Sequence, residues 1–201
     1  MDVSGIVLAG GMSRRLGRNK ALEPIDGEPL ISRVFKRLAR VSEQIVLVVN
    51  NQERASMLPL PDSSKIAVDL YPDGGSLGGI FTGLSAADGD WGVVAACDMP
   101  FLNMALFEYM LSLREGFDAV VPLLDGRPEP THAVYSKACL EPIERKLKAN
   151  DLKIAGFFDE VRVRYVPEED VEKHDPERLS FFNVNTQEDL ERALSLAARG
   201  R

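Results

Sequence analysis

The sequence predicts an α/β fold: a three-layer α/β/α sandwich with a Rossmann-like, mostly parallel sheet. Short apolar runs alternate with amphipathic stretches along the 201 residues, as strands and helices alternate in such folds. Residues 45–49 are apolar throughout, which is expected of a parallel strand covered on both faces. No linker, repeat or low-complexity segment is visible, so we expect a single domain over residues 1–201.

Seven segments have the length and composition of strands. The last of them alternates apolar residues with Arg162 and Arg164, which predicts an edge strand. The seven segments are residues 6–8, 45–49, 66–68, 93–96, 119–121, 133–135 and 161–166.

Helices are predicted between and after these strands. Apolar residues recur at helical spacing after Pro29, which suits the start of a helix. Thr186 is a good N-cap for the last helix, with Glu188 and Asp189 in its first turn. The predicted helices cover residues 30–39, 77–87, 105–113, 138–147 and 187–197.

Composition excludes several classes of protein. The net charge of −7 and the lack of a basic face or of an overall basic excess argue against a nucleic-acid partner. The longest apolar runs are strand-sized and no signal peptide is visible, so we expect no membrane association and a cytoplasmic location. The two cysteines, Cys97 and Cys139, are far apart and predict buried thiols in a reducing compartment.

A glycine loop follows the first predicted strand. Gly10 and Gly11 let backbone amides approach a ligand closely, and consecutive amides can bind an anion. Three arginines and Lys20 follow within ten residues, which favours a cradle for a triphosphate. A tight turn with solvated basic residues is the alternative. The loop is neither a P-loop nor the dinucleotide fingerprint.

Two acidic residues follow other strands. Asp98 stands at the end of the strand over residues 93–96, where a carboxylate could bind Mg²⁺ together with substrate phosphates. Asp69 precedes a glycine-rich loop over residues 74–79. In open α/β sheets ligands bind beyond the carboxyl ends of the strands, so this edge is the predicted site. Asp98 could instead be an ordinary turn or cap residue, and the glycines after Asp69 could instead serve tight helix packing.

These motifs, taken in order, resemble the molybdenum cofactor guanylyltransferase family (MobA) of nucleotide-diphospho-sugar transferase-like nucleotidyltransferases. The resemblance spans residues 6–186. It rests on Leu-Ala-Gly-Gly at 8–11 with Arg15 and Lys20, Val-Val-Asn at 48–50, the Asp69 loop, Cys-Asp-Met-Pro at 97–100 and Asn-Val-Asn-Thr at 183–186. Leu16, Asn19 and Ser76 depart from the usual family residues.

The resemblance implies transfer of GMP from GTP to Mo-molybdopterin with Mg²⁺ and release of pyrophosphate. It implies catalytic roles for Arg15, Lys20 and Asp98, with Asp98 on the metal, and places Asn183 and Asn185 on the acceptor side. The nucleotide-binding residues implied are Leu8, Ala9, Gly10, Gly11, Lys20, Asn50, Asp69, Gly78 and Asp98. Other cofactor-biosynthesis proteins are possible partners.

Other assignments stay open from the sequence. A related transferase could use CTP or another phosphorylated acceptor, and a non-catalytic nucleotide-binding regulator could share the scaffold. The attacking phosphate is already ionised at neutral pH, so this chemistry needs no histidine. We expect a structural role for His132 and a solvated side chain for His174.

Overall fold

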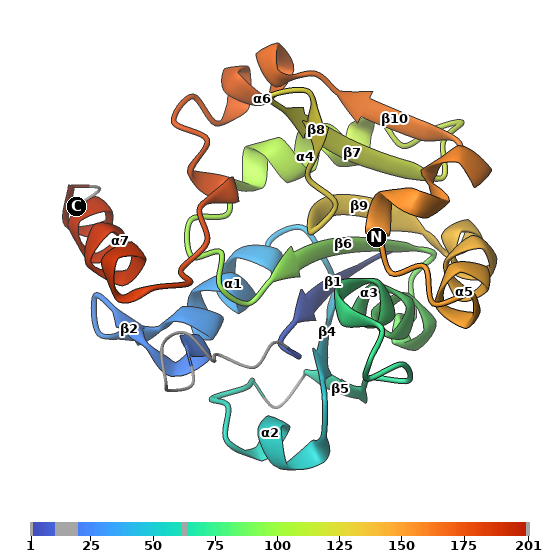
Figure 1. The fold of residues 1–201 in the computed structure, drawn as a ribbon. Coiled ribbons are helices and arrows are strands. Elements are labelled where there is room, and N and C mark those ends of the chain that lie inside the picture. The colour runs from blue at the N-terminus through green and yellow to red at the C-terminus, as the bar shows by residue number, and fades with distance from the viewer. Residues whose placement is uncertain (1, 11–19, 62–63, 200–201) are drawn as a thin grey trace.

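The computed structural model describes residues 2–10, 20–61 and 64–199. Its main sheet has the strand order β10-β7-β9-β6-β1-β4-β5, with β8 paired to β7 (Figure 1). A separate hairpin joins β2 and β3. The strands are β1 Val3–Leu8, β2 Pro24–Ile25, β3 Glu28–Pro29, β4 Gln44–Val49, β5 Lys65–Val68, β6 Trp91–Ala96, β7 Ala119–Leu124, β8 Arg127–Pro128, β9 His132–Ser136 and β10 Val163–Val166.

The predicted mostly parallel sheet is confirmed. Strands β6, β1, β4 and β5 are parallel neighbours, and β10 is parallel to β7. Only β9 and the short β8 run antiparallel to their neighbours in the main sheet of the described residues. The carboxyl ends of β6, β1, β4 and β5 therefore meet at one edge. Strand β10 lies at one end of the sheet, as predicted for an edge strand.

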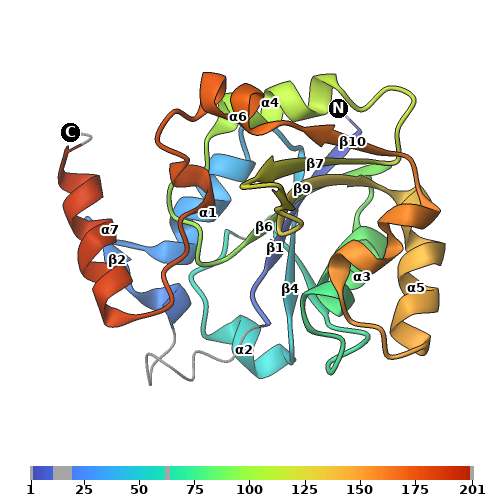
Figure 2. The same cartoon turned by 45° about the horizontal axis from the view of Figure 1, so that its top comes forward.

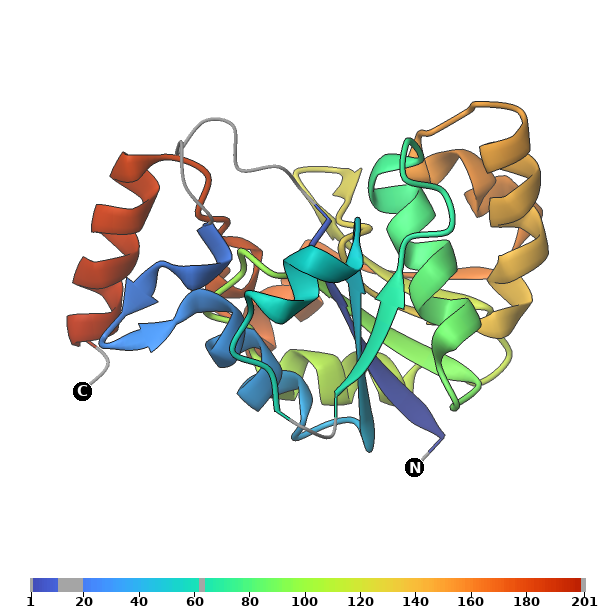
Figure 3. The same cartoon turned by 90° about the horizontal axis from the view of Figure 1, so that it is seen from below.

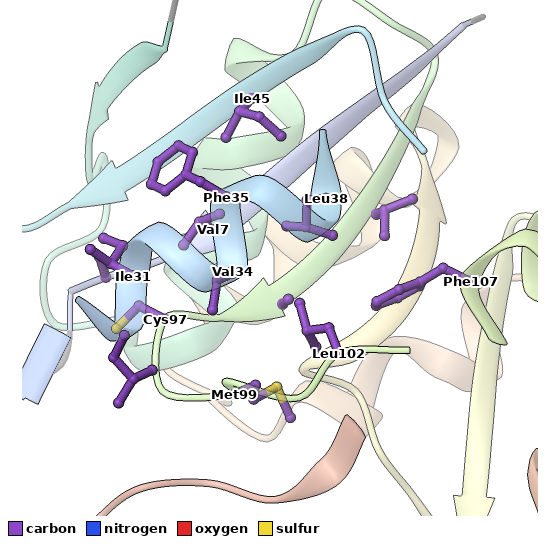
Figure 4. Close-up of a cluster of buried hydrophobic side chains, with 14 of the residues drawn as sticks. Val7, Ile31, Val34, Phe35, Leu38, Ile45, Cys97, Met99, Leu102 and Phe107 are labelled. Atoms are coloured by element: carbon purple, nitrogen blue, oxygen red, sulfur yellow. The ribbon is translucent and has the colours of Figure 1, made fainter. Parts of the chain in front are cut away.

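Helices cover both faces of the sheet, which makes the three layers that the sequence predicts (Figure 2). One apolar cluster joins the sheet to α1 and α4, and a second joins the other face to α3 and α5. Figure 4 shows Ile31, Val34, Phe35 and Leu38 of α1 in the first cluster. The helices are α1 Leu30–Leu38, α2 Gln52–Ser56, α3 Gly75–Ala86, α4 Met104–Ser112, α5 Leu140–Lys148, α6 Glu168–His174 and α7 Gln187–Arg199.

Helix α3 lies unusually close to β1 because glycines face the strand. A Cβ on Gly83 would stand 2.3 Å from Ile6 Cγ2, and one on Gly79 would stand 3.1 Å from Leu8 Cδ2. Real Cβ atoms essentially never approach another atom within 3.0 Å, so a side chain at Gly83 would force a shift, and the contact at Gly79 would be tighter than most. The close contact brings the start of α3 to the carboxyl edge of the sheet.

The last helix, α7, begins at the predicted cap. The Thr186 hydroxyl accepts a hydrogen bond from Asp189 N at 3.1 Å, and the Asp189 carboxylate accepts one from Thr186 N at 2.8 Å. This reciprocal pair is a capping box with Asp in place of Glu. Figures 1 and 3 show α7 beside the β2–β3 hairpin, away from α3 and α5.

Several elements were not predicted. Helices α2 and α6 are short, and β8 and the β2–β3 hairpin are formed by two-residue strands. Both hairpins turn at an Asp-Gly pair with positive φ, Asp26-Gly27 and Asp125-Gly126, which is a strong hairpin signal that could have revealed them. His174 is half-buried rather than fully solvated as predicted, because its ring stacks on Tyr109 with centroids 4.5 Å apart.

Within the described part of the chain, no helix is long and apolar enough to cross a membrane. Both cysteines are buried free thiols, as predicted.

Candidate active site

A cavity of about 290 Å³ lies at the carboxyl ends of β1, β4, β5 and β6. Its wall includes the start of α3, and the loops after the four strands supply its polar side chains. This is the sheet edge that the sequence predicts to bind a ligand. The lining residues are Leu8, Gly10, Lys20, Val48, Asn50, Asp69, Pro72, Gly75, Ser76, Gly79, Ala96, Cys97 and Asp98.

A charged cluster joins three separate motifs at one side of the cavity. The Lys20 ammonium forms an ion pair with Asp98 and donates a hydrogen bond to Asn185 Oδ1 at 3.0 Å. The Lys20 and Asp98 side chains are only 15% and 10% exposed. Val184 N donates to the backbone carbonyl of Asp98 at 3.0 Å, which anchors the segment of Asn185 to the end of β6.

Asp69 stands on the opposite side of the cavity, just after β5. Its Oδ1 accepts hydrogen bonds from Tyr71 N at 3.0 Å and from the Thr82 hydroxyl at 2.9 Å. No bond from another described residue reaches Oδ2. One carboxylate oxygen is therefore held by the protein, and the other keeps its capacity to accept a hydrogen bond.

Asn50 and Gly10 lie against each other at the ends of β4 and β1. A Cβ on Gly10 would stand 2.3 Å from Asn50 Oδ1, so the amide occupies the space that a side chain would need. Ala9 is fully buried, and its N–H donates to Val48 O at 2.9 Å. Ala9 thus fixes the strand end rather than lining the cavity.

The structure brings most of the predicted residues together. Leu8, Gly10, Lys20, Asn50, Asp69 and Asp98 line the cavity, and Asn185 adjoins it through Lys20. Gly78 does not line it, because it packs against Tyr71: a Cβ there would stand 2.6 Å from Tyr71 O. Asn183 donates to Phe181 O at 2.9 Å. Gly11 and Arg15 lie outside the described residues.

Sequence reasoning predicted a buried thiol at Cys97 and assigned it no role at the site. It lines the cavity beside Asp98 but is 4% exposed. Burial raises the pKa of the Cys97 thiol to about 12, so it stays protonated at neutral pH. A protonated thiol is a poor nucleophile, and Cys97 serves as a small apolar wall residue.

His132 takes no part in the cavity. It is fully buried and stacks on Phe107 with ring centroids 4.1 Å apart, while Phe181 covers it at 4.5 Å. Burial lowers the pKa of His132 to about 3, so the ring is neutral. The predicted structural role is confirmed.

The acidic groups suit a metal that phosphates help to hold. Among the residues that the structure describes, no three His, Cys, Asp or Glu side chains gather as a metal cluster. A metal held here would therefore have few protein ligands, and Asp98 is a carboxylate on the cavity wall that could supply one. Mg²⁺ commonly takes one or two protein carboxylates and fills its other positions with substrate phosphates and water, so the donor set fits such an ion.

A Rossmann-like sheet with a lysine, a carboxylate and glycine-rich loops around one cavity defines a nucleotidyltransferase. The family model of the MobA-like NTP transferase domain matches residues 5–163, and the chain belongs to this family.

Close relatives cover the whole chain. A "Molybdenum cofactor guanylyltransferase" of Desulfosudis oleivorans is 38% identical, with 99% of this chain and 98% of the relative aligned. A "Probable molybdenum cofactor guanylyltransferase" of Pelotomaculum thermopropionicum is also 38% identical, over 100% and 96%. The crystal structure of molybdopterin-guanine dinucleotide biosynthesis protein A from Archaeoglobus fulgidus superposes with a TM-score of 0.85 at 32% identity, covering 98% and 99%.

Proposed function

We propose that this nucleotidyltransferase moves GMP from GTP to Mo-molybdopterin and releases pyrophosphate, with Mg²⁺ as its metal and the cytoplasm as its location. The observation that carries the proposal is the cluster of Lys20, Asp98 and Asn185 beside one cavity, in a chain whose full-length relatives bear the name of this activity. Residues 1–201 would act as one domain.

GTP would lie along the cavity, between the Lys20–Asp98 ion pair on one side and Asp69 on the other. We assign the nucleoside to the side of Asn50 and Asp69, and the phosphates to the side of Lys20 and Gly10. Phosphate contacts from Gly11 and Arg15, which lie outside the described residues, are proposed from the family resemblance alone. Guanine presents N1–H and N2–H₂ donors, and a carboxylate such as that of Asp69 accepts from donors of this kind. Adenine and cytosine offer an acceptor at the corresponding ring nitrogen, so the same carboxylate would disfavour them.

In the reaction, a phosphate oxygen of the acceptor forms a bond to the α-phosphorus while the bond from that phosphorus to the β-phosphate oxygen breaks. Two anions must meet, so the protein has to supply positive charge and alignment. The Lys20 ammonium provides that charge at a side chain that is 15% exposed, where water weakens it little. Mg²⁺ held by Asp98 would add charge at the phosphates.

The acceptor would bind beside Asn183 and Asn185. Support comes from the contact of Asn185 with Lys20, which puts this segment next to the assigned phosphate position. No proton needs to be removed from an ionised phosphate, so the burial of His132 is no obstacle.

The test is turnover of GTP, CTP and ATP with the molybdenum-loaded pterin and Mg²⁺. We expect the dinucleotide product from GTP alone, and Asp98→Asn should slow turnover by about 10²–10³-fold. Asp90→Asn is the matched control, since Asp90 is exposed and precedes the other end of the same strand. Equal use of CTP would contradict the guanylyl assignment, and wild-type turnover by Asp98→Asn would contradict the role of that carboxylate.

A further inference from the structure

Thr82 is a buried polar residue without a role in the function proposed above. It lies in α3, is 2% exposed, and does not line the cavity. A threonine inside a helix commonly bonds its hydroxyl back to the carbonyl four residues earlier. The Thr82 hydroxyl instead donates to Asp69 Oδ1 at 2.9 Å and accepts from Leu70 N at 3.0 Å.

The bond from the Thr82 hydroxyl helps to fix the orientation of the Asp69 carboxylate, and the bond from Leu70 N orients the hydroxyl itself. Tyr71 N holds the same oxygen from a second direction, at 3.0 Å, so rotation of the carboxylate would break two hydrogen bonds. The Tyr71 bond is formed within the turn itself, two residues from Asp69. The Thr82 bond ties the Asp69 carboxylate to α3, a helix that packs closely against β1 through Gly79 and Gly83.

We propose that Thr82 is a positioning residue for base selection: its hydroxyl holds Oδ1 of Asp69 so that Oδ2 points at a fixed place in the cavity. This inference rests on the proposed contact between Asp69 and guanine. A carboxylate oxygen held in place distinguishes a base that carries a 2-amino group from one that lacks it, because a mispositioned acceptor gains little from that extra donor.

The probe pair is GTP and ITP, whose bases differ only in the 2-amino group. We expect wild-type protein to bind GTP about tenfold more tightly than ITP, the usual value of one hydrogen bond to a charged group. Thr82→Val keeps the β-branched shape and removes the hydroxyl, so the ratio of the two affinities should fall toward one. Thr82→Ser restores the hydroxyl and should restore the ratio.

Calorimetric titration of both nucleotides needs no acceptor, so the measurement is independent of transfer. Urea unfolding of each variant checks the fold, and Thr82→Ala serves if Thr82→Val does not fold. Thr82→Val also removes the acceptor of Leu70 N–H, and Thr82→Ser restores that acceptor together with the bond to Asp69. A purely structural role for Thr82 would change both affinities equally and leave their ratio intact.

The outcomes separate the inference from the function on which it rests. A wild-type ratio in folded Thr82→Val overturns the positioning role alone. Wild-type protein that binds GTP and ITP equally overturns the contact of Asp69 with guanine and the inference with it. A ratio lost in Thr82→Val and recovered in Thr82→Ser supports both.

Discussion

Replacing His132 by phenylalanine should make the protein's stability less sensitive to acid. The His132 ring is fully buried between Phe107 and Phe181, and neither ring nitrogen has a hydrogen-bond partner among the described residues. Burial would therefore penalise a charged imidazolium there far more than the surrounding backbone could compensate. Phenylalanine keeps a planar ring in the stack and cannot titrate.

The magnitude follows from the pKa of His132, which burial lowers from 6.5 to about 3 in the folded protein. Between these two values the unfolded chain binds a proton that the folded chain does not. Stability therefore falls as the pH drops below 6.5, and the loss is complete near the folded pKa. From pH 7 to pH 5 this one group should remove about 2 kcal/mol of unfolding free energy.

The assay is urea unfolding of both proteins at pH 7 and pH 5, followed by circular dichroism. Aspartates and glutamates titrate in both proteins, so the difference between the two pH dependences isolates His132. We expect wild-type protein to lose about 2 kcal/mol more than His132→Phe over this range. Parallel pH dependences would show that the His132 site accepts a proton without penalty and would refute the reasoning.

Two further changes test the site and the packing around it. Lys20→Met removes the ammonium that pairs with Asp98, so Mn²⁺ without nucleotide should bind this variant more tightly than wild-type protein in a calorimetric titration. Equal Mn²⁺ affinities would mean that Lys20 and the metal do not compete for Asp98. Gly83→Ala should cost about 1–3 kcal/mol of stability in urea unfolding, because its Cβ would meet Ile6, whereas Ala at exposed Ser85 in the same helix should cost little. A Gly83→Ala protein as stable as Ser85→Ala would show that α3 can move away from β1 without cost.

The sequence was sufficient for the fold class because its patterns are local. A run such as residues 45–49, apolar at every position, can only be a strand covered on both faces or a short buried helix, and the β-branched content favours the strand. The short helices α2 and α6 were missed because they contain too few residues to show a period. The two hairpins were missed because each pairs only two-residue strands, although their Asp-Gly turns were readable. The stacking of His174 on Tyr109 depends on tertiary contact between α4 and α6, which no local pattern reveals.

From the residues alone, the site could be predicted only where its side chains directly follow parallel strands of the sheet. Because parallel strands end at one edge, residues that follow β1, β4, β5 and β6 had to converge, and Lys20, Asn50, Asp69 and Asp98 do line one cavity. Asn183 and Asn185 follow no strand of that edge, so only the family resemblance pointed to them. The role of Thr82 could not be predicted from the sequence, because a threonine among small helical residues is equally consistent with a residue that only packs against its neighbours.

Lys20 contacts both Asp98 and Asn185, so the first and the last motif of the sequence lie together at one side of the cavity. These pairs are 78 and 165 residues apart in the sequence, yet one ammonium serves both. The bond from Val184 N to Asp98 O fixes the backbone of the last segment to the strand end that carries the carboxylate. A shift of Asp98 would therefore move the segment of Asn185 with it. The proposed metal ligand and the proposed acceptor side thus share one rigid frame, which is what alignment of an acceptor phosphate against a triphosphate requires.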